Sequence, residues 1–266
     1  MTALDISNAY SGLRGATRSR FWLVPLSALM GLAGWQLIVV IGQYPAFILP
    51  GPARVARRLI IALSDGTLLR HTAITLGEVL LGLVLGLLVA ALLGYLLAKS
   101  PAVERIVSPY VVASQSVPVV AYAPLLIIWF GSGLLSKVLI CTLIVFFPIL
   151  INVVVGLRGV PEELRDLMRS LRASPWQTFL QLELPAALPV LLGGLKIGAT
   201  LSVIGAVVGE FMGADAGLGF LVTLGRGQFD TALIFVAIFT LVAIATSLYS
   251  VIALLERRLL KWHKHY

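Results

Sequence analysis

Residues 161–189 read PEELRDLMRSLRASPWQTFLQLELPAALP, a charged stretch that interrupts an otherwise apolar chain. Pro161 suits the first turn of a helix, and the acidic Glu162 and Glu163 that follow favour the positive end of the helix dipole. Apolar side chains then recur at helical spacing, which predicts a helix with one apolar face and one charged face. The apolar residues are Leu164, Leu167, Met168 and Leu171.

A second helix start follows directly. Ser174 can cap a helix, Pro175 takes the first helical position, and Gln177 stands three residues after the cap, as in a capping box. We expect this helix to end before Pro185, because a proline biases the residue before it away from helical conformation. Two short amphipathic helices in tandem suit a groove on another protein, although composition alone also allows two helices that rest on lipid.

The composition of the whole chain is that of an integral membrane protein. Of its 266 residues, 59% are hydrophobic and 12% are charged, and the mean hydropathy is +1.00. Since a membrane-spanning helix needs about 20 apolar residues, we predict an all-α polytopic membrane protein of about six transmembrane helices, with almost no room for another domain. The predicted spans lie near residues 21–41, 72–98, 107–131, 136–157, 188–211 and 231–255.

The distribution of basic residues predicts the orientation of the chain. Most of the 20 Lys and Arg residues fall on the cytoplasmic side if both ends of the chain are inside. Residues 1–20 are then a cytoplasmic N-terminal tail, and the first apolar run, too long for a signal peptide, is a retained helix. This topology accounts for the net charge of +8, so we expect no nucleic-acid partner. Residues 52–64 combine helical apolar spacing with three arginines, which predicts a helix lying at the lipid interface.

Two prolines, Pro118 and Pro124, lie in the third apolar run and are expected to kink or break its helix. Broken helices are tolerated in lipid only where protein or a water-filled cavity satisfies the freed backbone groups. The run is therefore our candidate for lining a pathway, with a simple proline kink as the alternative. The candidate pathway residues are Ser114, Gln115, Ser116, Pro118, Tyr122, Asn152 and Glu210.

Three ionisable residues, Glu78, Lys196 and Glu210, fall inside the apolar runs, where a charge is costly. We expect Glu78 and Lys196 to pair with each other or with membrane lipid, and Glu210 to face an external partner or a gate. Residues 213–230 are expected to form an outside loop with short turns, and His71 to be solvated at a helix end. The chain has no P-loop, and its three histidines are too scattered for a metal site.

The opening stretch resembles the cytoplasmic coupling loop of bacterial ABC importer permeases. That family has Glu-Ala-Ala, three residues, Gly, nine residues and Ile-x-Leu-Pro. In the same frame this chain has Asp166-Leu167-Met168, Arg172 and residues 182–185. Segments such as FILPGPARV, PVVAYAPLLIIWFGSG and GAVVGEFMGADAGLGFL extend the resemblance over most of the chain, from about residue 45 to about residue 262.

The chain departs from this pattern at two positions. Asp166 replaces a glutamate, which shortens the side chain and keeps its charge. Arg172 replaces the glycine that ends the first helix in a left-handed conformation, at a cost of about 1 kcal/mol unless the corner is rebuilt with a negative φ. With a rebuilt corner, the angle between the two helices would differ from the angle in the family.

The resemblance implies the type I ABC importer fold, with residues 21–266 as the permease domain and residues 158–187 as its coupling loop. It implies a multi-pass protein of the bacterial inner membrane that works as a homodimer with two cytoplasmic ATPase subunits and an extracytoplasmic binding protein. The ATPase subunits would use ATP and Mg²⁺, while this chain would bind no cofactor or metal and would not be an enzyme. The residues expected to contact the ATPase are Glu163, Asp166, Leu167, Met168, Leu171, Arg172, Ala173 and Ser174.

The group that this chain resembles imports nitrate, bicarbonate, sulfonates, taurine, pyrimidine precursors of thiamine, and riboflavin. The runs LRDLMRSLRAS and VIGAVVGEF look closer to the pyrimidine and riboflavin branch than to the sulfonate branch. The rival from another class is an ion-coupled secondary transporter, which should show an intramembrane acidic cluster and two repeated halves, and the sequence shows neither. An intramembrane enzyme would need a nucleophile and a base, and no such pair is visible.

Overall fold

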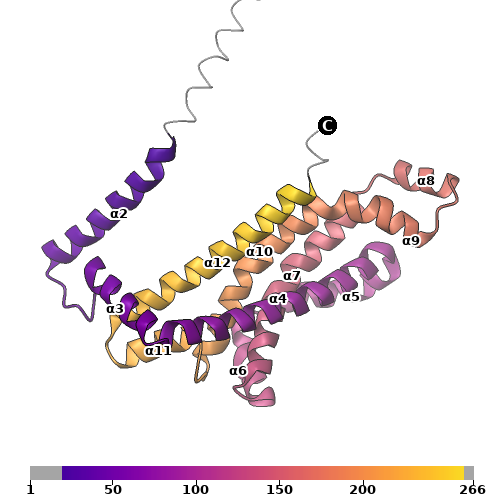
Figure 1. Ribbon diagram of the computed structural model, residues 1–266. Coiled ribbons are helices and arrows are strands. Elements are labelled where there is room, and N and C mark those ends of the chain that lie inside the picture. Colours follow the sequence, from indigo (N-terminus) through magenta and orange to yellow (C-terminus); the bar gives the residue numbers. More distant parts are fainter. Residues whose placement is uncertain (1–19, 261–266) are drawn as a thin grey trace, which may run out of the picture.

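The computed structural model describes residues 20–260, with side chains from residue 25 onward. The tail expected over residues 1–20 lies outside this part except for its last residue. Between residues 20 and 260 the chain forms helices and connecting turns, and no strand (Figure 1). The predicted all-α class is confirmed for these residues.

Five helices are long and apolar enough to cross a membrane, or six if a bent pair of helices counts as one span. Their bounds lie close to the predicted runs, and the second extends five residues further toward the N-terminus than expected. The five are α2 (Arg20–Gly42), α4 (Thr67–Lys99), α7 (Leu134–Arg158), α10 (Leu184–Phe211) and α12 (Thr231–Leu259).

Helix α7 packs between α4 and α10, and small residues let the three backbones approach closely. A Cβ placed on Gly82 of α4 would lie 2.2 Å from the Cβ of Cys141, and one on Gly205 of α10 would lie 2.7 Å from the Cα of the same residue. Cys141 is fully buried there. At the centre of the bundle, Gly82 and Gly205 therefore pack directly against Cys141 from two sides.

The bent pair consists of α5 (Pro101–Gln115) and α6 (Val119–Phe130), which meet at 95°. The apolar run predicted near residues 107–131 is therefore divided between two helices, and the expected break is confirmed. Pro118 stands at the N-cap of α6 and has no backbone N–H to continue a ladder of hydrogen bonds. The hydroxyls of Ser114 and Ser116 donate to the carbonyls of Val111 and Val112, which satisfies backbone acceptors next to the break.

Two shorter helices lie at one end of the bundle. Helix α3 (Pro52–Ser64) has the bounds predicted for the interfacial helix. Helix α11 (Leu218–Gly227) occupies the segment expected to form only turns, and that expectation was wrong. Its glycines lower helix propensity, but Gly219 and Gly225 permit contact with Glu210 and Ile234 that a larger residue would prevent.

Different helices lie at the two ends of the molecule (Figure 1). One end, called the α3 end below, holds α3, α11 and the starts of α4 and α12. The other, called the α8 end, holds α8 (Glu162–Ser170), α9 (Pro175–Thr178) and the last turns of α4 and α12, where Arg257 and Arg258 lie.

Candidate functional site

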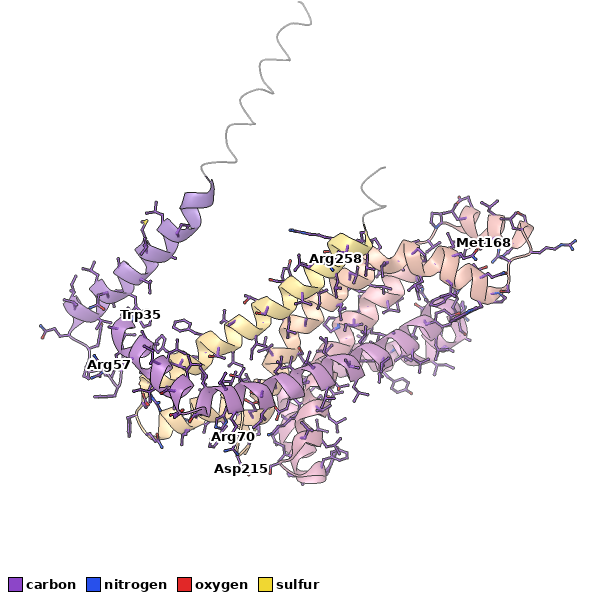
Figure 2. All side chains as sticks on the ribbon, in the orientation of Figure 1. Trp35, Arg57, Arg70, Met168, Asp215 and Arg258 are labelled. Carbon is purple, nitrogen blue, oxygen red and sulfur yellow. The ribbon has the colours of Figure 1, made fainter. Side chains whose placement is uncertain are left out.

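Helix α8 is a short helix at the tip of the α8 end; most of its residues are exposed and none is buried. Glu162 and Glu163 occupy its first turn and Arg169 its last, as the helix dipole favours. Figure 2 shows Met168 on this helix, at the opposite extreme of the molecule from Arg57 of α3. The sequence therefore predicted the existence of this helix and the register of its charges correctly.

A left-handed corner ends α8, and it is built at Arg172. This residue has a φ of 54°, so the corner keeps the conformation that a glycine would hold and is not rebuilt. The N–H of Ala173 donates to the carbonyl of Met168 at 3.0 Å, and that of Arg172 to the carbonyl of Arg169 at 2.9 Å. These two hydrogen bonds form a Schellman motif, whose geometry the arginine adopts despite its Cβ.

The second helix starts as the sequence predicts. The Ser174 hydroxyl accepts from the N–H of Gln177 at 3.2 Å, and the Gln177 side chain accepts from the N–H of Ser174 at 2.8 Å, which completes the capping box. Its predicted end was wrong, because the helix continues past Pro185. A π-helical segment, η1 (Phe179–Glu183), joins α9 to α10, so that one apolar helix runs over Pro175–Phe211.

The π segment has a local cause. Pro185 has no N–H to donate to the residue four positions earlier, and a regular helix would lose that hydrogen bond. In η1 the N–H of Leu184 bonds instead to the carbonyl of Phe179, one residue further back than in an α-helix. Such insertions let a helix pass an interruption without ending. The second arm of the loop is thus the rigid start of a membrane span, and not a separate helix.

The base of α8 is anchored by a buried carboxylate, Glu183, which the sequence did not single out. Glu183 is only 1% exposed, and its Oε1 is bonded by Lys99 Nζ of α4 and, at 3.2 Å, by Arg165 Nε of α8. Arg165 also donates to the carbonyl of Leu157, the last turn of α7, at 2.7 Å. One carboxylate and one guanidinium therefore join α4, α7, α8 and η1.

The expected ATPase contacts lie on the outer surface of α8 and of the corner at residues 171–174, which together we call the α8 knob. Leu167 and Leu171 are exposed large apolar side chains, while Met168 and Ala173 are half-buried at the corner. Asp166 is exposed and accepts from Arg169 of the same helix at 2.7 Å. The other three, Glu163, Arg172 and Ser174, are exposed as well. The structure thus gathers the predicted residues at the tip of one helix and its corner.

The expected pathway residues separate into three groups. Ser114 and Tyr122 line one cavity of about 330 Å³ between α5, α6 and α7, together with Trp129 and Phe147. Gln115, Ser116 and Pro118 lie exposed at the break beside it. The last two residues of the set, Asn152 and Glu210, do not line this cavity.

Asn152 and Glu210 are packing residues of the bundle. The Asn152 side chain lies against Gly194 of α10 and donates to the carbonyl of Pro148 at 2.8 Å. Glu210 is buried, with Oε1 accepting from Thr75 at 2.6 Å and Oε2 accepting from the N–H of Gly219. The expectation that Glu210 faces an external partner was wrong, because the turn before α11 folds back over its carboxylate.

A buried charged cluster lies near Glu210, and the sequence did not reveal it. Lys137 Nζ at the start of α7 lies 3.1 Å from Glu78 Oε1, and both side chains are almost fully buried. Glu78 therefore does not pair with Lys196, whose partner is Glu256 of α12 at 2.8 Å. Folding also brings Glu78 close to Glu210, although the two residues are far apart in the sequence.

The same cluster fixes the start of α11. The N–H of Gly217 donates to His71 Nδ1 at 2.9 Å, and the N–H of Leu218 to the Thr75 hydroxyl at 2.8 Å. The first backbone donors of α11 are thus satisfied by side chains of α4 and α10. His71 is buried and not solvated, and no signal in the sequence marks it, because its partner lies 146 positions away.

The comparisons with known proteins agree with this architecture. The sequence profile of the family described as binding-protein-dependent transport system inner membrane component matches residues 82–261. The riboflavin transport system permease protein of Chloroflexus aurantiacus is 49% identical over 90% of this chain and 89% of its own length. The formylaminopyrimidine transport permease protein of Halalkalibacterium halodurans is 38% identical over 89% of this chain and 94% of its own.

A more distant relative and a solved structure complete the picture. The putative aliphatic sulfonates transport permease protein of Bacillus subtilis is 33% identical over 88% of this chain and 85% of its own length. An inward-facing structure of a methionine ABC transporter matches with a TM-score of 0.65 at 22% identity, over 74% of this chain and 97% of the other. The last match supports the fold alone.

Replacing Arg172 tests the strained corner. Arg172→Gly removes the cost of a Cβ in the left-handed conformation, about 1 kcal/mol, so hydrogen-exchange protection of the α8 amides should rise about fivefold. Arg172→Ala is the matched control, since it removes the same side chain and keeps the Cβ, and it should leave protection unchanged. Equal protection in the two variants would contradict a corner strained at this residue.

Replacing Glu183 tests the anchor. Glu183→Gln leaves Lys99 and Arg165 without their shared carboxylate, and because both cations are partly solvated we expect a loss of about 2 kcal/mol. The temperature of thermal unfolding in detergent should fall by about 5 °C, with faster trypsin cleavage in α8. Glu163→Gln is the control, because Glu163 is exposed and has no ion pair among the described residues. Equal shifts for both variants would refute the anchor.

Proposed function

This chain belongs to the family of binding-protein-dependent transport system inner membrane components, and from that premise we propose that it carries a planar vitamin-type heterocycle, riboflavin or a pyrimidine precursor of thiamine. As a member of the family it is a multi-pass membrane protein and the permease subunit of an ABC importer. It is not itself an enzyme. The family implies an ATPase and a binding protein as partners.

The substrate proposal rests on the cavity beside the helix break. Tyr122, Trp129 and Phe147 present three aromatic rings to a space of about 330 Å³. Flat rings prefer to stack on other rings or meet them edge-on, at about 1 kcal/mol for each contact beyond the burial of area. Ser114 adds one hydroxyl at the wall. An aromatic wall with few polar groups and no charged side chain suits a flat, mostly uncharged ring system.

The same cavity argues against an alkyl sulfonate. The residues that line it include no basic side chain, whereas a buried sulfonate needs a cation or several hydrogen-bond donors. Two relatives with high identity are named for riboflavin and for formylaminopyrimidine, both flat heterocycles. The sulfonate-named relative has lower identity. Both the uncharged, aromatic lining and the higher identity to the two vitamin-type permeases favour a flat heterocycle over a sulfonate.

Coupling to ATP is assigned to the α8 knob. We place the α8 end in the cytoplasm, so that two copies of this chain present two knobs to an ATPase dimer that uses ATP and Mg²⁺. Exposed Leu167 and Leu171 fill an apolar groove of the ATPase, and Asp166 meets one of its basic residues. Because Glu183 and Arg165 tie α8 to three other helices, a displacement of the knob reaches α4 and α10 as a rigid-body motion.

Uptake measurements test the substrate. In vesicles that contain the permease with its ATPase and binding protein, we expect ATP-dependent uptake of riboflavin or formylaminopyrimidine and no uptake of taurine. Trp129→Ala should lower uptake about fivefold, as the loss of one ring contact predicts. Phe130→Ala is the matched control, since the neighbouring ring is exposed and does not line the cavity. Taurine uptake without vitamin uptake would overturn the proposal.

A charge reversal tests the coupling. Asp166→Arg places a cation against the basic residue expected on the ATPase, so substrate uptake should fall at least tenfold while ATP hydrolysis continues. Asp215→Arg is the control, because it makes the same charge change on an exposed residue at the α3 end (Figure 2) and should leave ATPase binding intact. Unchanged uptake by the Asp166 variant would remove α8 from the coupling role.

A further inference from the structure

A second cavity, of about 500 Å³, lies at the α3 end and takes no part in the proposed transport function. It is formed between α3, the turn that precedes α3 and the turn that leads into α12. Its wall combines three guanidinium groups with two aromatic rings and one carboxylate. These residues are Arg54, Arg57, Arg58, Phe47, Phe229 and Asp230, and we call this set the arginine pocket.

The charges of the arginine pocket are not balanced. Arg58 Nε donates to Asp230 Oδ2 at 2.7 Å, while Asp230 Oδ1 accepts from the N–H of Leu233 and caps α12. The single carboxylate is therefore already used. Arg54 and Arg57 are exposed, and neither has an acidic partner among the described residues. Since residues three apart share one face of a helix, both cations reach the same cavity.

The rim of the pocket is held in an unusual conformation. Phe229 has a φ of 56°, which a bulky residue rarely adopts, and its ring is 74% exposed. It meets the ring of Phe47 nearly edge-on, at 6.4 Å between centroids. The Thr231 hydroxyl donates to the carbonyl of Phe47 and ties the two turns together. Backbone strain that presents an exposed aromatic ring is often found at binding sites.

The position of the pocket favours a lipid ligand over a protein. Its lining includes the exposed apolar residue Ile61 and reaches Thr231, where the membrane-spanning α12 begins, while the spanning α2 ends at Gly42, just before the turn that forms its other wall. The pocket therefore lies where the apolar part of the molecule ends. Arginine side chains at that depth attract anionic headgroups, while aromatic rings occupy the level of the glycerol and the first methylenes. A docking protein would be expected to meet a broad polar surface, and not a cavity bordered by lipid-facing residues.

We propose that the arginine pocket binds the headgroup of an anionic phospholipid from the leaflet at the α3 end. The phosphate lies between Arg54 and Arg57, which donate charge-assisted hydrogen bonds to it. Arg58 is held in place by Asp230 and lines the wall behind. Phe47 and Phe229 cover the glycerol. Because the pocket joins α3 to the cap of α12, a bound lipid fixes the turn before α12 to the interfacial helix.

Lipid retention tests the proposal. The purified protein is placed in nanodiscs of phosphatidylcholine with increasing phosphatidylglycerol, and bound lipid is counted by native mass spectrometry after release. The double variant Arg54→Gln, Arg57→Gln should retain phosphatidylglycerol about tenfold less than the wild type. Its matched control is Arg70→Gln, Arg226→Gln, which removes the same charge from exposed residues of the α3 end outside the pocket and should retain it as the wild type does.

Three results would overturn the proposal. An equal loss of phosphatidylglycerol from both double variants would show that the lipid is attracted by the net charge of this end and that the pocket is not a specific site. Binding of inorganic phosphate to the wild type in detergent, lost in the pocket variant, would show a soluble-anion site. Unchanged lipid retention together with loss of binding-protein-stimulated ATP hydrolysis in the pocket variant would show a protein-docking surface. Equal unfolding temperatures of the two double variants serve as the check that both are folded.

Discussion

The constraint that organises this molecule is that an ionisable side chain inside an apolar bundle needs an opposite charge or several hydrogen bonds beside it. Glu183 of η1 is held by Lys99 of α4 and Arg165 of α8, and Lys196 of α10 by Glu256 of α12. The Lys99–Glu183 and Lys196–Glu256 pairs join helices that are distant in sequence. Lys137 and Glu78 likewise link α7 to α4, so that ion pairs connect neighbouring helices at both ends of the bundle.

The helical backbone is irregular at two places, and each lies beside a region to which we assign a function. The break between α5 and α6 lies beside the aromatic cavity, and the π segment at Phe179–Glu183 lies at the base of the α8 knob. Both follow from prolines that cannot donate a hydrogen bond. Elsewhere the helices are continuous and pack through glycines at the α4–α7–α10 centre, where nothing larger fits. A closely packed centre between two irregular regions agrees with the proposal that a displacement of the α8 end is transmitted to the cavity.

The elements that the sequence predicted well are those whose causes are local. The bounds of α3, the capping box at Ser174 and the break before α6 all depend on residues within a few positions of each other. The candidate ATPase contacts stay a prediction, and the structure shows only that they lie together on α8 and its corner, as their close spacing in the sequence requires. The wrong predictions concern partners distant in sequence. His71 with Gly217 and Glu78 with Lys137 come together only through packing. The end predicted before Pro185 is the exception, since its cause is local: the preceding turn widens and the helix continues.

The sequence by itself determined that the chain is an all-α membrane protein with a charged two-armed loop, because composition and helical periodicity are properties of short windows. The resemblance to the importer family also implied a corner at position 172, and it left open whether an arginine there would keep the left-handed conformation of a glycine. Only the tertiary structure decided that Arg172 does, that Glu210 turns inward, and that Ser114 and Tyr122 share a cavity while Asn152 does not. The physical reason is that burial and charge pairing depend on which helices touch, and that is a property of the whole bundle.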